Sequence, residues 1–131
     1  MTLPLFLLAA VLSSASDPLP KLLGRAFELG QLGLAEFPDG EAESPGHKAR
    51  RLSAAEELAA LAADPRPELR KAAVLALGKT AEADRESALL KAAKDAEAGV
   101  RAEAALALLR QRLLKRVTEY STATVNALVA L

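Results

Sequence analysis

The chain repeats one sequence motif at an interval of 31 residues. The first copy runs from Asp64 to Gly78 (DPRPELRKAAVLALG), and the second runs from Asp95 to Leu109 (DAEAGVRAEAALALL). A fixed period of this length is typical of stacked supersecondary units whose apolar faces are buried only by their neighbours. The motif therefore predicts a repeat protein with an extended surface that holds another molecule, and it does not identify that molecule.

Composition narrows the fold class. The 131 residues are 51% hydrophobic but only 3% aromatic, so the cores must be filled mainly by alanine and leucine. These are strong helix formers, and we predict one all-α domain: a short α-solenoid of helical hairpins with degenerate terminal helices. The net charge of zero argues against a domain that grips nucleic acid by charge alone. The lack of cysteine excludes disulfides and thiolate metal sites.

The first 15 residues have the pattern of a secretory signal peptide. The uncharged run Leu3 to Leu12 is too short to cross a bilayer. Small residues follow at Ser13 and Ala15, which fit the two positions that a signal peptidase recognises before its cleavage site. The alternative is an apolar first helix of the solenoid. Cleavage predicts export to the periplasm or the outside without a membrane span in the mature chain, and an uncleaved chain would be cytoplasmic.

The rest of the chain divides into four segments. Residues 35–52 are dense in proline, glycine and charge and show no apolar period, which predicts a loop or linker. Ser53 and Glu56 form a capping box that predicts the start of the next helix. The full division is an N-terminal helix or cap at 16–34, the linker at 35–52, two repeats at 53–117, and a C-terminal cap or tail at 118–131.

The two motif copies share the pattern Asp-x-x-x-x-Leu/Val-Arg-x-x-Ala. This pattern resembles the bacterial HEAT-like repeats of the phycobilisome-lyase type, which are pairs of helices about 30 residues long. The resemblance implies that Arg70 and Arg101 bridge neighbouring repeats through Asp64 and Asp95, as a structural ladder. The alternative is that the two arginines clamp a phosphate or carboxylate.

The parts that an enzyme needs are missing. Some HEAT-like proteins hold iron with repeated His-Glu pairs, but this chain has one histidine, His47, which we interpret as a surface residue. No serine has a histidine base on a rigid element, and no glycine pattern matches a phosphate loop. We therefore predict no catalytic residues, no cofactor and no metal site.

A protein partner remains as the expected ligand. Leu75 and Leu106 hold the same place in the two motif copies, away from the predicted buried face, and Lys71 and Arg110 lie one turn from them. We predict that these four residues line a concave surface of a protein-interaction module or scaffold. The alternatives are a noncatalytic subunit or fragment of a lyase-like enzyme and a nucleic-acid-binding repeat. A second candidate is a basic cluster formed by Arg110, Arg112, Lys115 and Arg116.

Overall fold

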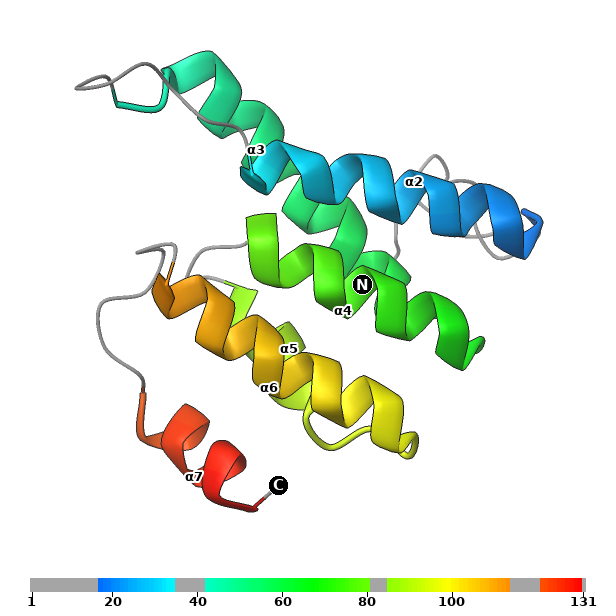
Figure 1. Ribbon diagram of the computed structural model, residues 1–131, viewed down its shortest axis with the longest axis vertical. Helices are drawn as coiled ribbons and strands as arrows, with labels where there is room; N and C mark the ends of the chain where they lie inside the picture. Colours follow the sequence, from blue (N-terminus) through cyan, green and yellow to red (C-terminus); the bar gives the residue numbers. More distant parts are fainter. Residues whose placement is uncertain (1–16, 35–41, 81–84, 114–120, 131) are drawn as a thin grey trace, which may run out of the picture.

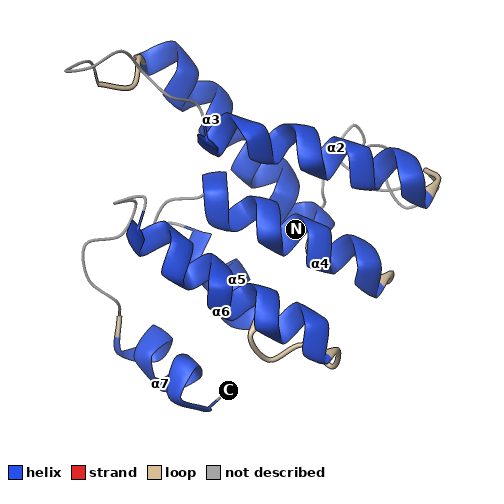
Figure 2. Cartoon of the chain, in the orientation of Figure 1, coloured by secondary structure: helices blue, strands red, loops and turns tan. Residues whose placement is uncertain are grey.

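The computed structural model describes residues 17–34, 42–80, 85–113 and 121–130. Within these ranges the chain forms six α-helices and one short 3-10 helix, without a strand (Figure 2). The predicted signal peptide lies outside the described residues. The elements, labelled as in Figure 1, are α2 (Leu19–Gln31), η1 (Leu32–Leu34), α3 (Pro45–Leu61), α4 (Pro67–Thr80), α5 (Glu86–Ala92), α6 (Ala98–Leu113) and α7 (Thr122–Ala130).

The helices are arranged in two layers. In Figure 1, α2, α4 and α6 lie side by side and run in the same direction, while α3 and α5 lie behind them. Helix α4 packs against both α2 and α6, and α7 packs against α5. The helix pairs α3/α4 and α5/α6 are therefore two stacked hairpins, and the prediction of an all-α solenoid is confirmed.

The core runs continuously through both hairpins. Its largest apolar side chains are leucines from every helix of the two hairpins, each at most 1% exposed: Leu58, Leu69, Leu77, Leu89 and Leu108. Leu77 and Leu108 hold equivalent places in the two motif copies, so each hairpin contributes the same anchor. Burying one leucine contributes about 1.5–3 kcal/mol, which makes this continuous core the main source of stability.

Two glycines set the spacing between the helices of the α2–α4–α6 layer. A Cβ placed on Gly78 would lie 2.6 Å from the Cα and Cβ atoms of Ala107 in α6. A Cβ placed on Gly30 would lie 3.0 Å from the Cβ atom of Ala76 in α4. Both junctions therefore bring a glycine against an alanine, and the distance at Gly78 leaves no room for a side chain.

The predicted linker at residues 35–52 is wrong in its second half, because α3 begins at Pro45. Ser44 caps this helix by accepting a hydrogen bond from the backbone N–H of His47 (3.2 Å), and Pro45 occupies the first turn, where its missing N–H costs nothing. Ser53, predicted to start the helix, lies in its interior. The first hairpin therefore starts at Pro45, and its first helix is longer than the repeat motif indicated.

Candidate partner-binding site

Phe27, Leu75 and Leu106 occupy equivalent positions on the three helices of the α2–α4–α6 layer. The glycine contacts give the register of the three helices. Gly30 of α2 lies against Ala76 of α4, and Gly78 of α4 lies against Ala107 of α6, which is the repeat equivalent of Ala76. Phe27 lies three residues before Gly30, Leu75 lies three residues before Gly78, and Leu106 is the repeat equivalent of Leu75. We call these three residues the apolar row.

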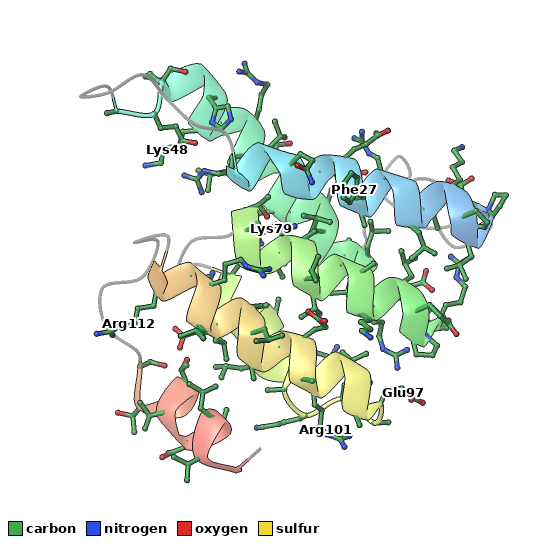
Figure 3. All side chains as sticks on the ribbon, in the orientation of Figure 1. Phe27, Lys48, Lys79, Glu97, Arg101 and Arg112 are labelled. Atoms are coloured by element: carbon green, nitrogen blue, oxygen red, sulfur yellow. The ribbon has the colours of Figure 1, made fainter. Side chains whose placement is uncertain are left out.

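The apolar row is accessible to solvent. Phe27 is 65% exposed and Leu106 is 51% exposed, while Leu75 is half-buried between them in the order of the helices. Figure 3 labels Phe27 on α2. Sequence reasoning found the two leucines through the repeat but missed Phe27, because α2 does not carry the repeat motif and its register with α4 is visible only in the packing.

Cationic side chains border the apolar row. Lys71 is exposed and extends toward the start of α6, where its Nζ atom would be 3.7 Å from a Cβ on Gly99. Lys79 and Arg110 follow Leu75 and Leu106 by one helical turn (Lys79 is labelled in Figure 3). One acid, Glu103, precedes Leu106 by three residues. These neighbours of the apolar row therefore carry more positive than negative charge.

Two polar atoms beside Leu106 are buried without a hydrogen bond. Among the described residues, the Nη1 atom of Arg110 and the Oε2 atom of Glu103 have no partner although solvent does not reach them. Unpaired buried donors and acceptors of this kind are uncommon and costly in folded proteins. The α6 end of the apolar row therefore contains one donor and one acceptor whose hydrogen-bonding capacity is not used among the described residues.

Arg70 joins the two hairpins. Its Nε and Nη2 atoms donate to both carboxylate oxygens of Asp95, at 2.8 and 3.0 Å, and its Nη1 atom donates to the backbone carbonyls of Asp64 and Pro65. The hydrogen bonds from Arg70 hold the pKa of the Asp95 carboxyl below its usual range. Arg70 thus links the turn of its own hairpin to the turn of the next one, 25 residues along the chain.

Asp64 is paired differently from Asp95. Its two carboxylate oxygens accept hydrogen bonds from Nε and Nη2 of Arg66, at 2.9 and 3.0 Å, and these bonds lower the pKa of Asp64. Arg66 also donates to the backbone carbonyl of Asp17, just before α2. Arg66 therefore joins the first turn to the segment that leads into α2.

Arg101 repeats only half of the contacts of Arg70. Its Nη1 atom donates to the backbone carbonyls of Asp95 and Ala96, at 2.8 and 3.1 Å, which are the repeat equivalents of the two carbonyls that Arg70 contacts. Among the described residues, no carboxylate forms an ion pair with Arg101. Within the described residues, the Arg–Asp series thus does not continue beyond Arg101, which is labelled in Figure 3.

A buried polar cluster closes the other end of the first hairpin. Arg51 is 1% exposed and donates to both carboxylate oxygens of Glu43 and to the backbone carbonyl of Thr80, at the end of α4. The Nδ1 atom of His47 lies 2.6 Å from a carboxylate oxygen of Glu43. The interpretation of His47 as a surface residue is wrong, because this contact and the packing of α3 bury it. The Ser44-Pro45 pair was the one sequence signal for this cluster.

The described residues lack two features that would indicate other kinds of function, namely a cluster of metal ligands and a membrane-spanning helix. They contain no group of three or more histidine, cysteine, aspartate or glutamate side chains placed to hold a metal ion. None of the described helices combines the length and the apolar character needed to cross a bilayer. Of the predicted basic cluster, Arg110 and Arg112 lie on α6, whereas Lys115 and Arg116 lie outside the described residues.

The two stacked hairpins define the class of the protein as an α-solenoid, and the comparisons name the family. Residues 40–130 match HEAT repeats, so the chain belongs to the HEAT-repeat family. Comparisons with curated proteins and with solved structures give no significant match.

Proposed function

We propose that the protein is a noncatalytic interaction module that binds a partner protein through the apolar row. The observation that carries the proposal is the exposure of Phe27 (65%) and Leu106 (51%) at equivalent positions of helices α2 and α6, and Leu109, 49% exposed and three residues after Leu106, extends this apolar surface along α6. Exposed hydrophobes in register on neighbouring helices suit an apolar segment of another protein. Family membership supports this role, since stacked helical repeats build extended binding surfaces.

The charges around the apolar row indicate the chemistry of the partner segment. Lys71, Lys79 and Arg110 border the row on two sides, and the buried Nη1 atom of Arg110 has no hydrogen-bond partner among the described residues. We therefore propose a segment with apolar residues in the middle and acidic residues at its flanks. Opposite charges at the rim would speed association and select the orientation of the bound segment.

A pair of matched variants tests this proposal. Phe27→Ser with Leu106→Ser removes the two most exposed members of the apolar row, and Val129→Ser removes an 81% exposed valine on α7 as a control. Both proteins should melt close to the wild type, because exposed side chains contribute little to stability. The double variant should lose the partners that the wild type and the control retain in quantitative capture experiments. Retention of the same partners with unchanged affinity would place the binding surface elsewhere, and Arg110 with Arg112 would be examined next.

We further propose that the repeats are of the phycobilisome-lyase type and that the protein is exported. The shared Asp and Arg positions of the two motif copies support the first point, and the apolar run Leu3 to Leu12 with small residues after it supports the second. N-terminal sequencing of protein from the native host tests export. A mature chain that starts within a few residues of Ser16 is expected, whereas an intact N-terminus at Met1 or Thr2 would argue for the first-helix alternative.

A further inference from the structure

Two pockets of similar size occupy equivalent places in the two hairpins. The pocket of the first hairpin, about 290 Å³, contains Arg70 together with Asp95, the carboxylate to which it is paired. The pocket of the second hairpin, about 300 Å³, contains Arg101 and Lys94. Its other lining residues are the alanines Ala93, Ala127 and Ala130. The second pocket therefore repeats the first one without the acid.

The guanidinium in the second pocket is held ready for a carboxylate. The Nη1 atom of Arg101 is fixed by two backbone carbonyls, as the Nη1 atom of Arg70 is. In Arg70 the other edge of the fork, Nε and Nη2, binds both oxygens of Asp95. The same edge of Arg101 has no hydrogen-bond partner among the described residues. A fixed guanidinium loses little conformational entropy on binding a carboxylate, so the empty edge is a pre-organised donor site for a carboxylate.

From this geometry we infer that Arg101 and Lys94 form a second binding site, which takes an aspartate of a partner protein. Asp95 shows the form of the ligand, since it lies in the turn before α6 and also accepts a hydrogen bond from the backbone N–H of Glu97. The occupant is thus an aspartate in the turn that precedes a partner helix. The three alanines leave room for the backbone of such a turn. Asp64 and Asp95 of a second copy are poor occupants, because Arg66 and Arg70 already bind them.

The site is independent of the apolar row. It is formed by the turn after α5, the start of α6 and the end of α7, whereas Phe27 and Leu106 lie on the α2–α4–α6 layer. Loss of binding at one site therefore does not predict loss at the other, and the two proposals can fail separately.

The probe is a synthetic peptide that copies residues 94–106 of the chain, which presents Asp95 at the start of a helical sequence, and the control peptide carries Asp95→Asn. Binding is followed in NMR spectra of the 131-residue protein by the arginine Nε–Hε signals, with the Arg101 signal assigned from Arg101→Lys, and by the backbone amide signals of Ala93 and Lys94, which every variant retains. We expect a saturable shift of the Arg101 signal at millimolar peptide. The affinity should fall about tenfold or more with the Asn peptide and with Arg101→Gln, because a charge-assisted hydrogen-bond pair is lost.

Two control proteins keep the test specific. Arg50→Gln removes one exposed cation of α3, outside the pocket, and should leave the affinity unchanged. Phe27→Ser with Leu106→Ser should also leave it unchanged, which separates this site from the apolar row. The inference is overturned if the Arg101 signal shows no saturable shift, if the Asn peptide binds as tightly, or if Arg101→Gln binds as tightly as the wild type.

Discussion

The α4–α6 and α2–α4 contacts are the two junctions of the α2–α4–α6 layer. Both place a glycine against an alanine, but their polar contacts differ. At the α4–α6 junction, Gly78 lies against Ala107, and Arg70 is paired with the carboxylate of Asp95. At the α2–α4 junction, Gly30 lies against Ala76 at a slightly larger distance, and Arg66 reaches only a backbone carbonyl, that of Asp17. Between the α-helices themselves, the junction of the two repeats is therefore closer and better paired, whereas the N-terminal cap makes its closest approach through Gly33 of η1, against the backbone of Lys79.

The difference follows from one substitution within the repeat. Arg66 in the first turn corresponds to Glu97 in the second. Among the described residues, no arginine of α2 or of the segment before it binds Asp64, and Arg66 of its own turn does so instead. Asp95 binds Arg70 of the previous repeat, and the position equivalent to Arg66 is an exposed glutamate, Glu97. The comparison teaches that the aspartate of a repeat can be paired either within its own turn or by the arginine of the preceding repeat.

Adding a methyl group at each junction glycine should produce the largest difference between them. Gly78→Ala forces atoms of Ala107 away from a 2.6 Å approach, part of it against backbone, and should destabilise the protein by about 1–3 kcal/mol or more. Gly30→Ala meets the Cβ atom of Ala76 at 3.0 Å and should cost less. Urea unfolding of both variants measures the order.

Gly24→Ala is the control for these two variants. No atom lies within 4 Å of a Cβ at this helical position, so the substitution should stabilise the protein by about 0.5–1 kcal/mol through helix propensity. An equal cost at Gly78 and Gly30 would contradict the view that the α4–α6 junction is the closer one.

Arg70 should contribute more to the stability of the protein than Arg101. Arg70→Ala leaves Asp95 without its partner in a largely buried junction and should cost about 1–3 kcal/mol. Arg101→Ala removes the same backbone contacts but no ion pair, so its cost should be clearly smaller. Thermal melts of the two variants check this order, and equal melting temperatures would remove the structural ladder as the reason for the Arg–Asp pattern.

Arg66→Ala should lower the melting temperature by less than Arg70→Ala. It leaves the Asp64 carboxylate with one donor, the backbone N–H of residue 66, and removes the contact to Asp17. Amide hydrogen exchange should show the loss mainly as faster exchange in α2, since Arg66 joins that helix to the first turn. Faster exchange in α6 instead would mean that Arg66 acts on the other junction.

The smallest effect we expect is a pH dependence shared by both junctions. The pKa values of Asp64 and Asp95 are lowered, through hydrogen bonds from Arg66 and Arg70, so below pH about 4 the unfolded chain binds more protons than the folded one. Stability from these pairs is complete above that pH and is lost as pH falls through the folded pKa values. The stability difference between the wild type and Asp95→Asn should be constant above pH 5 and shrink at lower pH. A difference that grows on acidification would contradict this assignment.

The repeat itself determined most of the fold. The spacing of Asp64 and Asp95, the apolar period between them and the helix-forming composition predict two helical hairpins, and the described helices α4 and α6 fall on the motif copies. Local signals of this kind work because stacked repeats bury the same positions in each unit. The first motif copy also contains Pro67, and α4 begins at this residue because the fixed φ of proline suits the first turn of a helix.

The tertiary structure decided the features that depend on non-local partners. In the sequence, the first half of α3 has the composition of a polar linker, because Arg51 and His47 occupy two of its buried positions. Pairing with Glu43 offsets the free-energy cost of burying these two polar side chains. The register of α2 on α4, and with it the place of Phe27 in the apolar row, follows from one close glycine contact. Arg70 and Arg101 hold equivalent sequence positions but have different partners, and this difference also depends on non-local contacts. The carboxylate that pairs with Arg70 comes from the next unit of the stack, and the described residues supply none to Arg101.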